Sequence, residues 1–169
     1  SRGLGDVYKR QNLLGEAMLN DAENPNYMML RAWVFEKYLN RPVAAEDLYN
    51  KVADMENFYI DNPRSLKGFA QLFLGQTELG KRWIDNILDT VTDYDGLIHY
   101  YGACFYAQYG DVDRAMELAG KSLDLGYANY HDWTEAIDGR VNVAPLRDDL
   151  RFLNLLHRHD AIFGKESKK

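Results

Sequence analysis

Three features of the 169-residue sequence predict an all-α fold. Apolar residues recur every three or four positions over most of the chain, which places them on one face of a helix. Asn-Pro pairs at 24–25 and 62–63 each supply a helix cap followed by proline at the first helical position. No stretch alternates between apolar and polar residues as a half-buried strand does. We therefore expect amphipathic helices joined by short turns.

The first helix pair is predicted over residues 25–60. A short candidate helix at 12–20 precedes it. Asn24 can cap the first helix of the pair, which continues to about residue 39, and Pro42 opens the second. The first helix is apolar around much of its circumference, which is typical of a helix that lies between neighbours.

The second and third pairs are predicted over residues 61–95 and 96–129. Gly75 ends the first helix of the second pair, and Gly110 does the same in the third, because glycine readily adopts the positive φ of a helix stop. Asp111 can accept from the free N–H groups of the helix that follows Gly110. The turn before the third pair is acidic, with Asp93 or Asp95 placed as its cap.

The remaining residues are expected to close the array. An aromatic and less regular stretch, 127–139, is followed by a single helix at 144–163 that Pro145 opens. The apolar residues expected to dock this helix are Leu146, Leu150, Leu153 and Leu156. The single domain thus spans 12–164, and the polar tail 165–169 should fray.

The turns repeat with a fixed period. Asn40, Gly75 and Gly110 lie 35 residues apart (40 to 75, and 75 to 110), and small residues follow each turn at 45, 80 and 115. A period in the mid-thirties built from helix pairs is typical of a solenoid. A single hairpin cannot cover its own apolar face, so each pair buries that face against the next.

The third unit resembles the tetratricopeptide repeat (TPR) family. It carries Ala103, Tyr106, Gly110-Asp111, Ala115 and Ser122-Leu123 at the family's spacing. The second unit matches at Gly75, Gly80, Ile84, Ile87 and Leu88, and the first has Asn40 where the family prefers glycine. Residues 144–158 are similar to the closing segment that follows such repeats in many bacterial proteins.

This resemblance implies antiparallel helix pairs stacked as a short right-handed superhelix, an α-solenoid with a C-terminal cap. In such arrays the first helix of each pair lines a concave groove that receives a peptide or a partner's helix. The candidate partner-binding residues on that face are Tyr27, Val34, Tyr38, Phe69, Phe73, Tyr100 and Gln108, with Leu30 and Cys104 beside them. Aromatic anchors suit a binding hot spot, and packing between helices is the alternative role for these side chains.

Composition excludes several functional classes. Hydrophobic residues make up 46% of the chain and aromatic residues 13%, which favours a packed core over disorder. The net charge of −6 argues against nucleic acid as a partner, since phosphate backbones select basic surfaces. No apolar run approaches the roughly 18 residues that a membrane span requires, so we expect no membrane span.

The single cysteine, Cys104, has no partner for an intramolecular disulfide, which is typical of a reducing compartment and favours the cytoplasm. A secreted chain that has lost its signal peptide is the alternative.

Residues 1–11, SRGLGDVYKRQ, resemble a translated sequencing adaptor, and we expect them to be a non-native leader. A native basic tail is the alternative. On the first interpretation, the natural N-terminus and any upstream domain precede this sequence.

The sequence contains no complete motif for catalysis, cofactor binding or metal binding. His99 and Cys104 lie five residues apart on one helix, on different faces, and no orienting group accompanies them. His157 and His159 point to roughly opposite sides of a helix, and no Cys or carboxylate set completes a metal site. The acidic run 85–95 lacks the spacing of a calcium loop.

We therefore predict a non-enzymatic scaffold that binds a protein or peptide. The alternative is an accessory or sensor region of a larger protease, kinase or transcription regulator whose catalytic part lies upstream. Self-association through an exposed end of the repeat is a further expectation, because three units are near the lower limit for an independent solenoid.

Overall fold

The computed structural model describes residues 23–55, 63–134 and 139–163, and these are arranged in helices, turns and loops without a strand. The predicted all-α class is therefore confirmed. The predicted leader 1–11, the short helix at 12–20 and the tail 165–169 lie outside the described residues. The α-helices are α2 (Pro25–Lys37), α3 (Pro42–Ala53), α4 (Pro63–Phe73), α5 (Thr77–Thr90), α6 (Leu97–Tyr109), α7 (Val112–Asp124), α8 (Tyr130–Thr134) and α9 (Leu150–Arg158).

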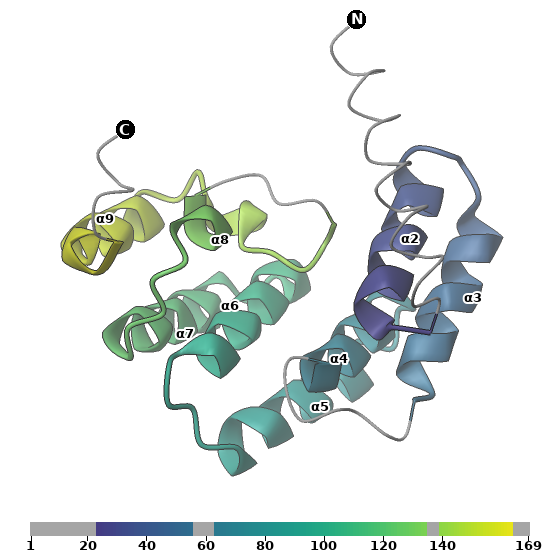
Figure 1. Ribbon diagram of the computed structural model, residues 1–169, viewed down its shortest axis with the longest axis horizontal. Helices are drawn as coiled ribbons and strands as arrows, with labels where there is room; N and C mark the ends of the chain where they lie inside the picture. Colours follow the sequence, from purple (N-terminus) through teal and green to yellow (C-terminus); the bar gives the residue numbers. More distant parts are fainter. Residues whose placement is uncertain (1–22, 56–62, 135–138, 164–169) are drawn as a thin grey trace, which may run out of the picture.

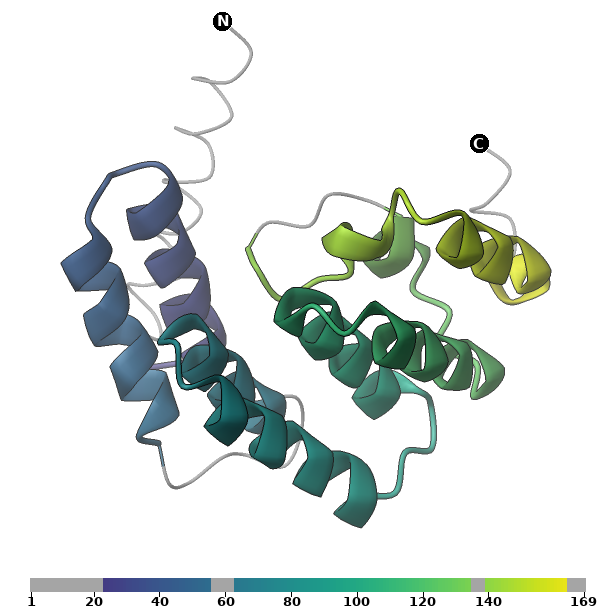
Figure 2. The same cartoon turned by 180° about the vertical axis from the view of Figure 1, so that it is seen from behind.

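Six of these helices form three consecutive antiparallel pairs, α2–α3, α4–α5 and α6–α7, and the two members of each pair pack along one another. Figure 1 shows the pairs following one another along a curve, with α2, α4 and α6 toward its inner side. The view from behind in Figure 2 shows the same order. A short 3₁₀ helix, η1 (Ala144–Leu146), contacts α6, and α9 contacts α7.

Local sequence signals explain where these helices start. The Asn24 side chain accepts from the Asn26 N–H at 2.9 Å, so the predicted cap of α2 is confirmed. Asp111 caps α7 in the same way, through the Arg114 N–H at 3.0 Å. Before α6, the carboxylate of Asp95 accepts from the Leu97 N–H. Capping side chains satisfy N–H groups that have no partner within their own helix.

The three turns of the 35-residue period share a left-handed residue. Asn40 has φ 49°, Gly75 φ 78° and Gly110 φ 97°. Asn tolerates this region better than other non-glycine residues, which explains its place in the first turn. Gln76 and Asp111 follow the two glycines, and their N–H groups bond to the carbonyls five residues earlier, at 2.8 and 3.0 Å. This is the hydrogen bond of a Schellman stop.

Helices α4 and α5 approach closely at two glycines. A Cβ atom on Gly80 would lie only 2.6 Å from the backbone carbonyl oxygen of Gly68. A Cβ on Gly68 would lie 2.8 Å from Ile84, which is buried in the core. The backbones therefore meet where neither helix carries a side chain.

We predict that Gly80→Ala destabilises the protein although alanine favours helices. The gain in helix propensity is about 1 kcal/mol. Overpacking typically costs about 1–3 kcal/mol, and a clash of 2.6 Å with a backbone atom places the cost above that gain. Gly120→Ala in α7 is the matched control, because its Cβ would meet only Leu155, at an ordinary 3.8 Å. Urea unfolding should show a loss for Gly80→Ala and no loss for Gly120→Ala. Equal stability of the two variants would contradict the close approach.

The C-terminal part differs from the single helix expected at 144–163. It consists of η1, α9 and a second 3₁₀ helix, η2 (Asp160–Phe163). Asp149 interrupts the run because its side chain accepts from the Arg151 N–H at 2.8 Å and starts α9 as a new helix. The new start changes which residues face the core. Phe152, Leu155 and Leu156 are buried, whereas Leu150 and Leu153, expected to dock, are 74% and 47% exposed.

His159 ties the end of α9 to α7. Its two ring nitrogens lie 2.8 Å from the Leu155 carbonyl oxygen and 2.9 Å from a carboxylate oxygen of Asp124. Both partners are acceptors, so they favour the doubly protonated imidazolium. The hydrogen bond to Leu155, supported by that to Asp124, raises the pKa of His159 above its ordinary value of 6.5.

This raised pKa predicts that stability falls as the pH rises. The stabilisation that protonated His159 provides is present in full below the pKa that His159 has in the unfolded chain. It is lost as the pH rises through the higher pKa that His159 has in the folded protein. Thermal unfolding measured from pH 6 to pH 8.5 should show this decline in the wild type and a weaker one in His159→Gln. His157→Gln is the control, because that side chain is 84% exposed. An unchanged pH profile in His159→Gln would contradict the assignment.

Candidate functional site

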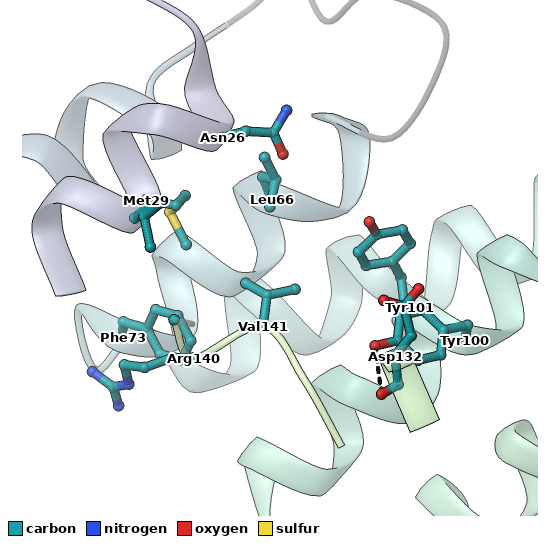
Figure 3. A pocket seen from close by; sticks show the side chains of 11 residues that line it. Asn26, Met29, Leu66, Phe73, Tyr100, Tyr101, Asp132, Arg140 and Val141 are labelled. Carbon is teal, nitrogen blue, oxygen red and sulfur yellow. Dashed lines mark hydrogen bonds between the residues drawn. The ribbon is translucent and has the colours of Figure 1, made fainter. Parts of the chain in front are cut away.

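A cavity of about 220 Å³ lies on the inner side of the curve, between α2, α4, α6, α8 and residues 139–141. Its apolar wall consists of Met29 and Leu30 from α2, Leu66 and Phe73 from α4, and Val141. Figure 3 shows Met29, Leu66 and Val141 on one side of the space and Tyr101 with Asp132 on the other. The first helices of all three pairs therefore contribute to one cavity.

The opposite wall is polar. Tyr100 and Tyr101 come from α6, and Asp132 comes from α8. The Tyr100 hydroxyl donates to the main-chain oxygen of Asp132 at 3.3 Å, drawn as a dashed line in Figure 3. The Tyr127 hydroxyl donates to the Asp132 carboxylate. Burial and this bond to a carboxylate raise the pKa of Tyr127, so the phenol stays protonated and donates at neutral pH.

Residues 139–143, which we call the inner segment, occupy part of the inner surface. The Arg140 guanidinium lies 3.9 Å from the centre of the Phe73 ring and 3.0 Å from a carboxylate oxygen of Glu36 on α2. Gln108 on α6 donates to the main-chain oxygen of Asn142 at 3.3 Å. The inner segment thus contacts the first, second and third helix pairs.

The inner segment keeps its shape through local bonds. The Asn142 side chain donates to the Gly139 carbonyl oxygen and accepts from the Ala144 N–H, both at 2.9 Å. Gly139 has φ 105°, a backbone conformation that favours glycine. Val143 is fully buried and anchors the end of the segment. Asn142 therefore closes a loop that presents Arg140 and Val141 to α2 and α4.

The polar wall depends on a buried tryptophan in α8. Trp133 is fully buried, and its ring centre lies 4.9 Å from that of Tyr100 and 6.2 Å from that of Phe152 in α9. Its indole N–H donates to the Tyr127 carbonyl oxygen at 3.1 Å. These contacts hold α8 between α6 and α9 and so place the neighbouring Asp132 at the cavity.

Three of the predicted groove residues take part in this site. Phe73 and Tyr100 line the cavity, and Gln108 holds the inner segment. Leu30, which was expected beside them, also lines the cavity. Tyr100 is only 3% exposed, so it forms a wall of the cavity and part of the core at once.

The other four candidate residues lie elsewhere. Phe69 is fully buried between the helices, with its ring 5.5 Å from that of Phe105, and Val34 is 7% exposed. Tyr38 is 40% exposed at the end of α2, where it packs edge-to-face on Trp33, and Tyr27 is half-buried outside the cavity lining. Helical spacing alone does not distinguish the inner face from the faces that pack between pairs.

Sequence reasoning missed the second half of the site. Asp132 and Gly139 lie in the stretch 127–139, which was expected only to be aromatic and irregular, and Arg140 and Val141 lie between it and the helix expected from residue 144. A usable signal was the concentration of aromatic residues around Trp133, because buried aromatics in a loop region anchor it to the array. No local rule connects Arg140 to Glu36, 104 residues away.

The residues weighed for catalysis and metal binding have structural partners. Asp93 accepts from the His99 N–H and contacts the His99 ring at 2.5 Å. Cys104 is fully buried, and burial raises the pKa of its thiol. Within the part of the chain that the structure describes, no three His, Cys, Asp or Glu side chains are grouped to hold a metal ion. No helix among these described residues is both long enough and apolar enough to span a membrane.

Comparison with protein-family models, curated proteins and solved structures finds no match for this chain. The resemblance to tetratricopeptide repeats therefore rests on residue spacing and stays a prediction.

We predict that Arg140→Met destabilises the protein more than Glu36→Gln does. The partly exposed ion pair contributes no more than about 1 kcal/mol, whereas the stacking of Arg140 on Phe73 adds about 0.5–2 kcal/mol. Arg140→Met removes both contributions. Glu36→Gln removes the charge of the ion pair and keeps an amide oxygen that can still accept from the Tyr49 hydroxyl, which lies 3.3 Å from Glu36. Free energies of unfolding in urea test this order. Equal losses in the two variants would show that the stacking contributes nothing.

Proposed function

We propose that this chain is a non-enzymatic interaction module that binds a segment of a partner protein on its inner surface. The module is a short tetratricopeptide-like array, in which three antiparallel helix pairs stack as a right-handed superhelix and the C-terminal helices close the last pair. The partner segment lies across the first helices, α2, α4 and α6, and is anchored at the cavity.

The 35-residue period supports the array. Its three turn residues, Asn40, Gly75 and Gly110, all have the left-handed conformation that ends a helix. The small residues at equivalent places after each turn, Ala45, Gly80 and Ala115, are all buried. Repeats of this kind bury their apolar faces on their neighbours and leave an inner surface for binding.

The observation that carries the proposal is the cavity itself. Its lining combines an apolar wall, formed by Met29, Leu30 and Leu66, with the polar groups of Tyr101 and Asp132. An apolar depression with a few convergent polar groups is the usual form of a binding site. Interfaces that accept a peptide concentrate their affinity at such anchor points.

Selection from a random-peptide display library on the immobilised protein tests the proposal. We expect the enriched peptides to share a motif and to lose at least tenfold in affinity for Leu30→Gln, measured by calorimetry. The substitution keeps the side chain's size and places an amide in the apolar wall, where a polar group without a partner is unfavourable.

Leu79→Gln is the matched control. Leu79 lies on α5, the second helix of its pair, and is 46% exposed, so its substitution should leave peptide affinity unchanged. Circular dichroism of both variants verifies that they fold. The proposal is wrong if no common motif is enriched, or if Leu30→Gln binds the selected peptides as tightly as Leu79→Gln does.

A further inference from the structure

The size of the cavity limits what part of a partner can enter it. Its volume is about 220 Å³. An apolar cavity of about 150 Å³ is large enough to bind benzene. The space therefore accepts one aromatic side chain, either a substituted single ring or an indole, and it is too small for two.

The apolar wall favours a ring over other shapes. Met29 and Leu66 lie on one side of the cavity and Tyr101 on the other, as Figure 3 shows. Thioether sulfur makes favourable contacts with aromatic rings, and methionine adapts its shape to the group beside it. Pairs of aromatic rings add about 0.5–1.5 kcal/mol beyond the burial of their area.

The charges around the cavity favour a hydrogen-bond donor. The guanidinium of Arg140 is neutralised by Glu36 and lies over Phe73. Asp132 is the carboxylate in the lining, and the Tyr127 hydroxyl donates to one of its oxygens. A carboxylate has about four acceptor sites, so Asp132 can accept a further donor. A purely apolar ring would cover Asp132 without satisfying it.

From these three observations we infer that the cavity receives one tyrosine or tryptophan side chain of the partner, whose hydroxyl or indole N–H donates to the Asp132 carboxylate. This inference rests on the proposed function, since it names the anchor of the segment that the inner surface binds. Tyrosine and tryptophan combine a large rigid ring with a polar tip, as the cavity requires.

Single amino-acid amides test the anchor without knowledge of the partner. N-acetyl-tyrosinamide and N-acetyl-tryptophanamide should bind with a Kd of about millimolar, as ligands of this size do. N-acetyl-phenylalaninamide should bind at least about tenfold more weakly, which corresponds to one lost hydrogen bond to a charged acceptor. Asp132→Asn should reduce this preference for tyrosine over phenylalanine. Chemical-shift changes in NMR titrations provide both the affinities and the site.

Val141→Trp and Val43→Trp form a matched pair of variants. The first places an indole in the cavity wall and should abolish binding of the amides. The second makes the same change on α3, where Val43 is 71% exposed, and should leave binding unchanged. Binding that persists in Val141→Trp would overturn the inference.

The remaining outcomes separate the inference from the proposed function. Tighter binding of N-acetyl-argininamide or N-acetyl-leucinamide than of the tyrosine derivative would overturn the aromatic anchor. No binding of any amide, together with selected peptides that lack tyrosine and tryptophan, would also overturn it, although those peptides would support an interaction module. Amide binding at the cavity without any selected peptide would uphold the anchor and contradict the proposed function.

Discussion

The burial of Trp133 is the interaction on which the inner side of the molecule depends. Its indole lies between Tyr100 of α6 and Phe152 of α9, and its N–H is satisfied by the Tyr127 carbonyl oxygen. Truncation of such a side chain typically costs about 3–5 kcal/mol. Successive residues of a helix differ in direction by about 100°. When Trp133 enters the core, the preceding Asp132 is consequently turned toward the cavity.

The inner segment completes this arrangement from the other side. Its contacts reach α2 through Glu36, α4 through Phe73 and α6 through Gln108. Each contact is modest, since the ion pair is partly exposed and Gln108 makes one neutral bond. Together they connect the three helix pairs through one segment from the C-terminal part of the chain. The same contacts narrow the inner surface to a cavity that fits one side chain.

The array itself follows from constraints that act at short range. Caps at Asn24 and Asp111 start helices, and left-handed residues at Gly75 and Gly110 end them. The expected starts of α2, α3, α5, α6 and α7 were accordingly close to the observed ones, whereas α3 ends at Ala53, earlier than the first pair was expected to end. The exception was the C-terminal run, where Asp149 accepts from a following N–H and starts a new helix. Aspartate occurs both inside helices and at their caps, so its identity alone could not distinguish the two roles.

The sequence by itself determined the helical class, the 35-residue period and the turn residues, because caps, prolines and left-handed glycines act within a few residues of where they stand. Only the tertiary structure decided which apolar side chains face the cavity. Phe69 and Phe73 lie four residues apart on α4, yet the first is fully buried against Phe105 and the second lines the cavity beneath Arg140. That difference depends on where residues 139–141 return to the array, and contacts between such distant parts of a chain are set by packing and not by local preference.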